Sequence, residues 1–387
     1  MIYLDANATT PPDPAVIEAM LPFLTQHFGN PSATYAGGRY ARRAVEKARG
    51  QVAAMIGAEA EEILFTNGAT ESINSVHFSA QRTMPERPLL VMSTTEHAAT
   101  LACAERWKAQ GGRVKMIPVY PNGLLNLEAL ESALEAGRTA LVSMLWGNNE
   151  TGVIQPMAEI SHLAHEAGAL VHADAVQMAG KVPVDVRAAG VDFLSLSGHK
   201  MHAPKGIGAL YVNRYAGYEP LIIGGGQERE RRSGTENVPG MVALGKAAEL
   251  AMQQVDESGV RGLRDLLEER LQTALPEIHI HGKDAPRLPN TASVCFPGVD
   301  SAGLMIRLDQ KGVACSGGSA CHAGALQPSH VLEAMGYDAR HAGSTLRFSL
   351  SRLTTSVEIE QAAVEILAAV SHLREQWDPG VVVTVAG

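Results

Sequence analysis

The segment at residues 191–212 reads VDFLSLSGHKMHAPKGIGALYV, and its two apolar runs decide the fold class. Residues 191–194 have the composition of a short buried strand, and residues 204–212 read as a turn followed by a second strand. Between the two strands, a hydroxyl-rich turn leads to Lys200. A lysine held at an interior sheet edge has its pKa lowered by burial or by its neighbours, so its amine can bond to an aldehyde. The segment therefore predicts a sheet with a reactive lysine at its edge.

From about residue 60 the chain alternates apolar strands with helices, which is the pattern of an α/β fold. The expected strands are residues 62–66, 89–91, 114–117, 140–145 and 170–173. The expected helices between them include residues 127–136 and 157–168. The pattern predicts a large α/β unit with a mainly parallel sheet covered by helices.

The pattern changes after the two helices expected at residues 240–255 and 261–275. Beyond them, the expected elements are strands at residues 291–296 and 344–350 and helices at residues 302–311, 329–335 and 357–377. This arrangement indicates a smaller α+β unit, and a chain of 387 residues is long enough for two cores. We therefore expect a large domain over residues 15–255 and a small domain formed by residues 1–14 and 256–387.

Composition and charge are typical of a globular enzyme. The net charge of −9 provides no basic field to hold a nucleic-acid backbone. No apolar run approaches the roughly 18 residues of a membrane span, and residues 1–5 lack the features of a signal peptide. The four cysteines form no Cys-x-x-Cys pair and are expected to be reduced thiols. We expect a cytoplasmic protein with no direct contact to nucleic acid or membrane.

Polar residues that could hold a phosphate and a ring follow three of the expected strands. Residues 67–70 lie between a strand and a helix, so their amides and the Thr70 hydroxyl could hold a phosphate, although a simple helix cap is the alternative. Ser197 and His199 end a neighbouring strand and would join the same phosphate site. His97 follows another strand, where it would stack on a ring or serve as a structural histidine.

A carboxylate completes this set of strand ends. Asp174 closes the strand at residues 170–173, and Gln177 follows within one helical turn. A buried aspartate needs a cationic partner, which a protonated pyridine nitrogen would supply; a helix-capping aspartate is the alternative. With Lys200 as the amine, the strand ends offer all the groups that pyridoxal phosphate requires. The combination therefore predicts this cofactor.

The segment 314–324 is rich in glycine and small residues, and we expect it to form a mobile loop. Cys321 in this loop would be exposed, and His322 beside it would favour the thiolate, which makes Cys321 the candidate nucleophile. The role of Cys315 stays open, since a pair with Cys321 could bind a metal or form a disulfide. The cysteines expected in the core are Cys103 and Cys295.

Arg347 lies within the apolar strand expected at residues 344–350 and therefore needs an anion nearby. The carboxylate of an amino-acid substrate would match its bidentate guanidinium group. An internal salt bridge is the alternative.

Taken in order, the motifs resemble those of cysteine desulfurases of the NifS/IscS kind, within the class V aminotransferase superfamily, over nearly the whole length. The matching segments are residues 3–11 (YLDANATTP), 29–32 (GNPS), 94–97 (TTEH), 148–152 (NNETG), 172–177 (HADAVQ), 197–200 (SGHK), 232–237 (RSGTEN), 319–321 (SAC) and 347–350 (RFSL). The resemblance implies a fold type I pyridoxal-phosphate enzyme. Its large domain would hold a mainly parallel seven-stranded sheet, and its smaller α+β domain would carry the catalytic cysteine loop.

The resemblance also implies a role for each matching residue. The catalytic residues would be Lys200, which binds the cofactor covalently, Cys321, which attacks the substrate sulfur, and His97, which stacks on the cofactor ring. Asn149 and Arg347 would bind the substrate. The cofactor-binding residues would be Ala69, Thr70, His97, Asn149, Asp174, Gln177, Ser197, His199, Lys200 and, toward the phosphate of the neighbouring subunit, Thr235.

The implied activity is the removal of sulfur from L-cysteine, which gives L-alanine and a Cys321 persulfide. The persulfide would pass to a sulfur-acceptor or iron–sulfur scaffold protein, and the expected unit is a homodimer. A selenocysteine lyase or another class V aminotransferase is the alternative. No permanent metal site is expected, although Cys321 could transiently ligate an iron–sulfur cluster. His322 and Ala323 replace the small hydroxyl residues of many relatives, so acceptor choice or thiolate chemistry would differ.

Overall fold

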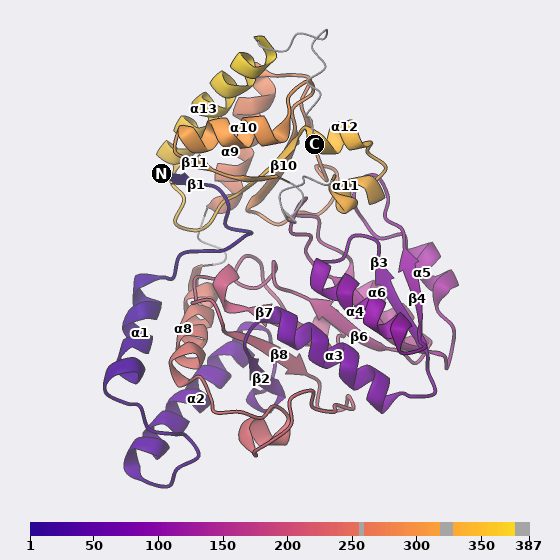
Figure 1. Cartoon of the computed structure of the whole chain (residues 1–387), viewed down its shortest axis with the longest axis vertical. Helices are drawn as coiled ribbons and strands as arrows, with labels where there is room; N and C mark the ends of the chain where they lie inside the picture. Colours follow the sequence, from indigo (N-terminus) through magenta and orange to yellow (C-terminus); the bar gives the residue numbers. More distant parts are fainter. Residues whose placement is uncertain (255–258, 318–327, 376–387) are drawn as a thin grey trace, which may run out of the picture.

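The computed structural model describes residues 1–254, 259–317 and 328–375, which form two packed units (Figure 1). The larger unit is built on a seven-stranded sheet in which only β8 runs antiparallel to its neighbours. The spatial order of its strands is β2 (Ile63–Thr66), β8 (Gly208–Val212), β7 (Phe193–Ser197), β6 (Leu170–Asp174), β5 (Thr139–Leu145), β3 (Leu89–Ser93) and β4 (Arg113–Ile117). The predicted α/β class with a mainly parallel seven-stranded sheet is confirmed.

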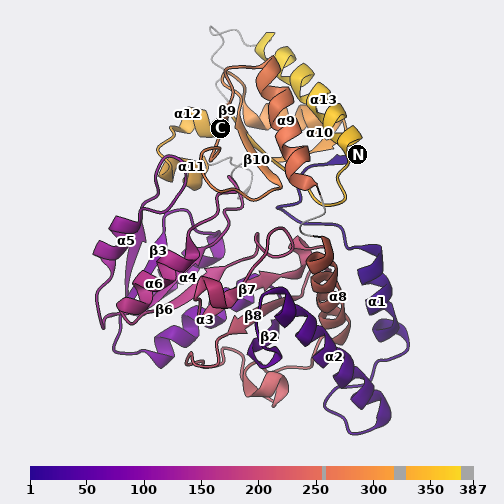
Figure 2. The ribbon, with the colours of Figure 1, turned by 180° about the vertical axis from the view of Figure 1, so that it is seen from behind.

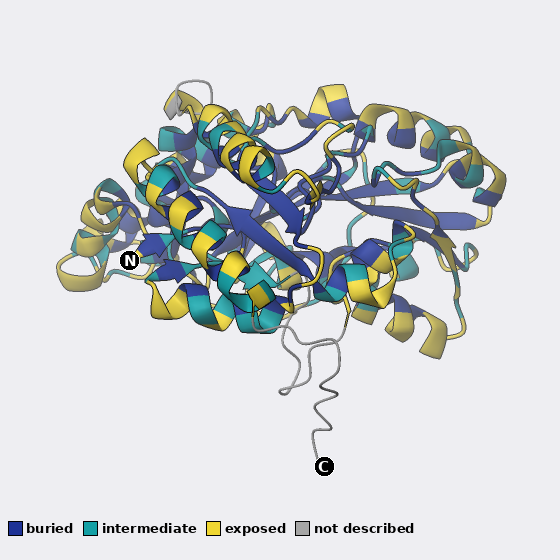
Figure 3. Cartoon of the chain, turned by 90° about the horizontal axis from the view of Figure 1, so that it is seen from above, coloured by how far each residue is buried: buried dark blue, intermediate teal, exposed yellow. Residues whose placement is uncertain are grey.

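Helices cover both faces of this sheet. They are α1 (Pro14–Thr25), α2 (Ala36–Met55), α3 (Ala69–Thr83), α4 (Ala98–Ala109), α5 (Leu127–Ala133), α6 (Met157–Glu166), α7 (Val186–Ala189) and α8 (Val238–Gln254), with the short 3-10 helices η1 (Ala60–Glu62), η2 (Gly198–Lys200) and η3 (Gln227–Glu230). Every residue of β5 is buried, as expected for a strand covered on both sides. The strands are buried throughout the centre of the molecule, whereas the helices are exposed on their outer faces (Figure 3).

The helices α1, α2 and α8 lie side by side at one end of the sheet (Figures 1 and 2). Helix α2 buries Ala41, Val45, Ala48 and Val52, whose spacing places them on one helical face. A side chain at Gly245 of α8 would lie 2.5 Å from the Ala48 Cα atom, so the two helices pack at backbone distance. This apolar layer anchors the end of the sheet that carries β2.

The smaller unit has its own core and an antiparallel sheet. That sheet has the order β12 (Ser316–Gly317), β13 (Thr345–Ser349), β10 (Thr291–Cys295) and β9 (His279–Ile280), and β1 (Ile2–Tyr3) pairs separately with β11 (Val313–Ala314). The helices are α9 (Val260–Ala274), α10 (Ser301–Gln310), α11 (His330–Ala334), α12 (Ala339–Gly343) and α13 (Ser356–Glu375). Ile2 and Leu4 pack into this core, beside Phe296 and Phe348. We propose that the two units are the domains with the boundaries expected from the sequence.

The strand expected at residues 191–194 begins later than predicted. In the structure β7 starts at Phe193, because Asp192 belongs to the preceding turn. The Asp192 carboxylate accepts hydrogen bonds from the Val171 backbone at 2.8 Å and from the His165 ring at 2.9 Å. These side-chain bonds tie the turn to β6 and α6 before the strand begins.

None of the described helices combines the length and apolarity that crossing a membrane requires.

Strands β2, β3, β6 and β7 all run in the same direction and therefore end at the same edge of the sheet. Ligands of open α/β sheets bind outside these carboxyl ends. The topology thus selects one edge for a functional site.

Candidate active site

A cavity of about 540 Å³ lies at the carboxyl edge of the sheet. Nine residues that the sequence singled out line it: Ala69, Thr70, His97, Asn149, Asp174, Gln177, Ser197, His199 and Lys200. They come from the ends of four strands and from the segment after β5. The cavity is large enough for a small-molecule cofactor together with an amino acid.

Lys200 ends η2, directly after β7, and its side chain reaches the cavity. Its Nζ atom donates hydrogen bonds to the backbone carbonyls of Asn7 at 2.5 Å and Ala8 at 2.8 Å. Burial, assisted by the positive charge of Arg347, lowers the pKa of Lys200 to about 8, against the opposing effect of Asp5 and Asp174. About a tenth of the amine is therefore neutral at pH 7, compared with less than a thousandth for an ordinary lysine.

Asp174 is the last residue of β6 and is buried. Its Oδ1 atom accepts a hydrogen bond from the Val176 backbone at 3.1 Å, and no salt bridge satisfies the carboxylate within the described ranges. Burial raises the pKa of Asp174, whereas His97 and Lys200 act to lower it. The Asp174 carboxylate thus lines the cavity, where it can bind a cation. No side chain of the described residues forms a salt bridge with it.

His97 lies at the N-terminus of α4, where its Nδ1 atom accepts a hydrogen bond from the Ala99 amide at 3.2 Å. This bond places the proton of a neutral ring on Nε2. The imidazole is exposed and lines the cavity, so its cap role and a contact with a bound ring are compatible.

The amino end of α3 forms a second polar wall of the cavity. Gly68 precedes the helix with a φ of 146°, a conformation that favours glycine. The free amides of the first helical turn, the Thr70 hydroxyl and Ser197 surround this wall, which suits an anion. Burial and nearby lysines lower the pKa of His199 to about 4, so its ring is a neutral hydrogen-bonding group there.

Arg347 lies on β13 of the smaller unit and reaches toward the same edge. Its guanidinium donates to the Asn149 carbonyl at 3.0 Å and to the Asp5 carboxylate at 2.7 Å, so the internal salt bridge considered from the sequence is present. Its buried Nε atom has no hydrogen-bond partner among the described residues. The arginine therefore retains a donor for a further acceptor.

Three predicted site residues are not among the described residues that line the cavity: Arg347, which contacts the Asn149 carbonyl, Thr235 and Cys321. Thr235 is exposed and does not line it. Cys321, like most of the predicted cysteine loop, lies outside the described residues. Burial raises the pKa of the other three cysteines, to about 11 for Cys103 and Cys295 and to about 12 for Cys315, so their thiolate forms are disfavoured.

Asn7 is a central residue of the site for which no role was predicted. Its carbonyl accepts from Lys200 and from Gln177 Nε2 at 3.0 Å, and its side-chain oxygen accepts from the Lys181 amine at 3.1 Å. Burial lowers the pKa of Lys181 well below its ordinary value. The available signal in the sequence was a polar asparagine between two alanines near the chain start. Only the packing of residues 1–14 brings this asparagine to the sheet edge.

The chain matches the Aminotransferase class-V family over residues 2–362, which is most of its length. The chain belongs to this family. It is 46% identical to "Cysteine desulfurase 2" of Trichormus variabilis over 97% of this chain and 94% of that protein. It is 43% identical to "Cysteine desulfurase NifS" of Azotobacter vinelandii over 96% of this chain and 93% of that protein.

Solved structures agree with this family. A "NIFS-LIKE PROTEIN" superimposes with a TM-score of 0.89 at 36% identity, over 96% of this chain and all of that chain. A structure titled "SspA in complex with cysteine" superimposes with a TM-score of 0.81 at 33% identity, over 92% of this chain and all of the other. The resemblance predicted from the motifs, and with it the fold type I architecture, is confirmed.

Proposed function

We propose that the chain is a pyridoxal-phosphate-dependent cysteine desulfurase that forms L-alanine from L-cysteine and carries the sulfur as a Cys321 persulfide. The observation that supports this most strongly is the single cavity lined by Lys200, Asp174 and His97, each from a different strand end. The names of its full-length relatives point to the same activity.

The chemistry of the cavity fits pyridoxal phosphate. Asp174 presents a buried carboxylate without a cation of its own, which a protonated ring nitrogen would complement. The first turn of α3, with Thr70, Ser197 and His199, supplies donors for a phosphate. Gln177 and the His97 ring would hold the remaining ring edge and face. We assign these residues, with Ala69 and Asn149, to the cofactor.

When bound, the cofactor supplies an aldehyde that bonds to amines and a ring that accepts electrons from the substrate. The lowered pKa of Lys200 provides a neutral Nζ atom for covalent attachment of the cofactor. When it is not bonded to the cofactor, the same Nζ atom would carry a proton to or from the substrate. The Asn7 and Ala8 carbonyls orient the amine at the cavity wall.

Arg347 and Asn149 would orient the substrate carboxylate. The unpartnered Nε of Arg347 offers a donor, and the guanidinium carries the positive charge that a carboxylate requires. Its pairing with Asp5 holds the group in place before substrate arrives. Because Arg347 belongs to the smaller unit, the substrate would bind between the two units.

Cys321 would take the sulfur. Its thiolate bonds to the substrate sulfur while the carbon–sulfur bond breaks, and a proton replaces sulfur on the carbon. In sum, one cysteine and one thiol give one alanine and one persulfide, with no external oxidant. The pKa of each of the three described thiols is raised, which disfavours their thiolates and leaves Cys321 as the assigned nucleophile.

We further propose a homodimer in which Thr235 contacts the phosphate bound by the neighbouring subunit. Thr235 is exposed and does not line the chain's own cavity. Phe28 and Ile223 are 86% and 81% exposed, and we propose that a second copy covers these apolar side chains. The persulfide would pass to a sulfur-acceptor or iron–sulfur scaffold protein in the cytoplasm, without direct contact to nucleic acid or membrane.

The test is a product assay on the purified full chain supplied with pyridoxal phosphate. We expect alanine and, with a thiol reductant, an equal amount of sulfide from L-cysteine. Alanine formed much faster from selenocysteine would support the selenocysteine-lyase alternative instead. Absence of alanine from both substrates, in protein that has taken up the cofactor, would overturn the proposal.

A further inference from the structure

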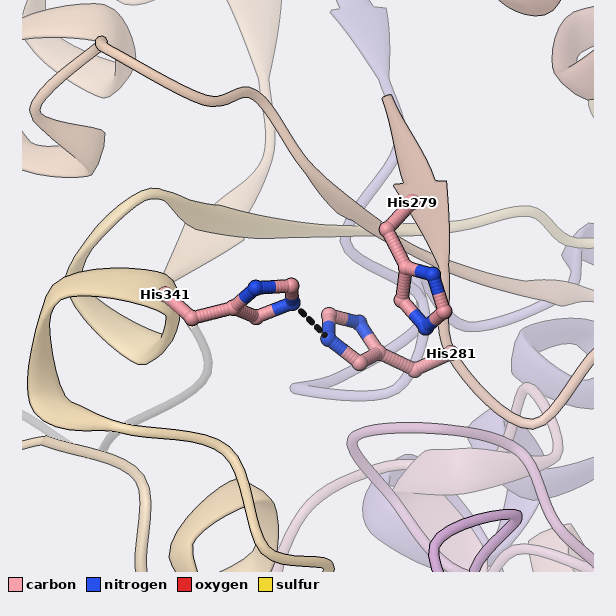
Figure 4. Close-up of side chains that lie close together, drawn as sticks. All are labelled: His279, His281 and His341. Atoms are coloured by element: carbon pink, nitrogen blue, oxygen red, sulfur yellow. Dashed lines mark hydrogen bonds between the residues drawn. The ribbon is translucent and has the colours of Figure 1, made fainter. Parts of the chain in front are cut away.

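Three histidines converge in the smaller unit, away from the cavity described above (Figure 4). His279 begins β9, His281 follows this strand directly, and His341 lies on α12. None of them lines the active-site cavity. Residues two apart on a strand project to the same side, which explains why His279 and His281 can share a site.

The ring nitrogens lie close enough together to share one metal ion. One nitrogen from each histidine lies within 4.8 Å of the other two. The Nε2 atoms of His281 and His341 lie 2.9 Å apart and point toward one another (Figure 4). Zinc–nitrogen bonds of about 2.0–2.1 Å at a tetrahedral angle place two ligand atoms roughly 3.3 Å apart, so a small rotation of either ring would admit an ion.

A second layer of hydrogen bonds orients two of the rings. The Nδ1 atom of His281 lies 3.1 Å from the Ser293 hydroxyl and 3.3 Å from its carbonyl. Donation from Nδ1 to this carbonyl leaves a lone pair on Nε2, the atom that faces His341. Tyr337 stacks on the His341 ring, and its hydroxyl lies 2.7 Å from Nε2 of His279. Ligating histidines are commonly oriented in this way.

Protonation and charge also suit a cation. Burial lowers the pKa of His281 to about 3 and also lowers the pKa of His279 and His341, so burial favours the neutral form of each ring. The carboxylates of Asp284 and Asp338 act on His279 and His341 in the opposite direction, which places negative charge near the cluster. Neutral imidazole is the form that binds metal.

We propose that His279, His281 and His341 bind one divalent transition-metal ion, with Zn²⁺ as the preferred ion. Three imidazoles with a fourth position left for water is a known zinc arrangement, and imidazole also suits Ni²⁺ and Co²⁺. His279 is exposed, so an ion and its water can enter from that side. The ion joins α12 to β9. This site is separate from the proposed desulfurase chemistry and stands whether or not that activity is found.

The test measures metal binding in the full-length Cys321→Ser protein, because this change removes a thiol that binds Zn²⁺ on its own. After chelator treatment and dialysis, we titrate ZnCl₂ calorimetrically and measure bound zinc by mass spectrometry. We expect one tight site per chain. Bound Co²⁺ should give the visible absorption of a four-coordinate site with three nitrogen ligands and one water.

The ligand variants are His279→Ala, His281→Ala and His341→Ala, with His162→Ala as the matched control. His162 lies on α6, and its side chain is 72% exposed. We expect each ligand variant to weaken the tight site by about 100-fold or more, and the control to retain it. His279→Ala removes an exposed side chain, so this variant tests the site even if the buried His281→Ala protein fails to fold. An unchanged tight site in folded His279→Ala and His341→Ala, or no tight site in the parent, would overturn the proposal.

Discussion

The active-site cavity and the histidine cluster both collect titratable side chains from distant parts of the chain, but they do so by different routes. In the cavity, Lys200, Asp174 and His97 each lie at or shortly after the carboxyl end of a parallel strand. His279 and His341 instead come from an antiparallel edge strand and a short helix. Parallel strands deliver their carboxyl ends to one sheet edge, so motifs after successive strands predict a shared site. In an antiparallel sheet, the strand register must be known before one can predict which side chains lie close together.

The two regions also differ in charge. The cavity holds an amine, a carboxylate and the Arg347–Asp5 ion pair, which match a charged cofactor and substrate. The cluster holds three imidazoles whose neutral form burial favours, and this form suits a metal ion. We therefore propose covalent chemistry for the first region and metal binding for the second. The following experiments test that division, beginning with the largest expected effect.

Removing the proposed nucleophile is the most direct test of the proposed desulfurase reaction. We expect Cys321→Ser to abolish alanine formation from L-cysteine while the absorbance of bound pyridoxal phosphate stays intact. Cys103→Ala is the control and should retain activity, because Cys103 is a shielded thiol on α4. Retained sulfide release by Cys321→Ser would refute the assignment.

The second experiment removes the amine. Lys200→Ala should lower alanine formation by about 10³–10⁴-fold, because the variant loses both the covalent anchor and the proton carrier. Absorbance after borohydride reduction would show whether the cofactor still attaches covalently. Lys115→Ala, an exposed change on β4, should behave like the parent. Borohydride-resistant attachment in Lys200→Ala would show that another lysine is the anchor.

Neutralising the buried carboxylate tests the charge match of the cavity. Asp174→Asn keeps the side-chain shape but removes the charge proposed to pair with the ring nitrogen. We expect alanine formation to fall by about 10²–10³-fold, with cofactor still bound and its absorption band shifted. Normal turnover in this variant would mean that the carboxylate serves only as a cap of the Val176 turn.

The pH dependence of cofactor attachment tests the lowered pKa of Lys200. Only the neutral amine attacks the aldehyde, so attachment should accelerate as pH rises through about 8. Between about pH 7 and pH 9 the neutral fraction, and with it the initial rate, should rise about tenfold. Stopped-flow absorbance on cofactor-free protein measures this rate. A rate still rising at constant slope beyond pH 9 would indicate an ordinary lysine pKa.

The smallest expected effect concerns the histidine cluster. Zn²⁺ at about 100 times its dissociation constant should add about 2.7 kcal/mol to the stability of the cofactor-bound Cys321→Ser protein, seen as a thermal midpoint raised by a few degrees. The His279→Ala protein in the same background should show no rise. An equal rise in both proteins would place the stabilising ion elsewhere.

Much of the active site follows from the sequence because its motifs are local. The strand end, the small turn and the lysine at residues 193–200 are contiguous in the sequence, so β7 leads directly into η2. Asp174 likewise closes an apolar strand that is evident from its composition. The parallel order of these strands then places both residues at one edge.

Other features of the fold and the site could not be predicted without the tertiary structure. Asn7 reaches the cavity only because Ile2 and Leu4 pack into the smaller core, which carries the chain start across to the larger unit. The Arg347–Asp5 pair was one of two alternatives open from the sequence, and packing decided that the salt bridge forms. The strand β7 begins at Phe193 and not at residue 191 as predicted, because the Asp192 side chain forms hydrogen bonds to β6 and α6.

By itself the sequence determined the α/β class, the order of elements and the set of residues at the strand ends, because apolar periodicity and turn residues act over short distances. It also determined the family. Only the tertiary structure decided how the chain start meets Lys200, how Arg347 is paired, and that His341 faces His281. These side-chain contacts depend on strand register and on the placement of helices in a second core. Both arise from the burial of apolar surface contributed by residues hundreds of positions apart.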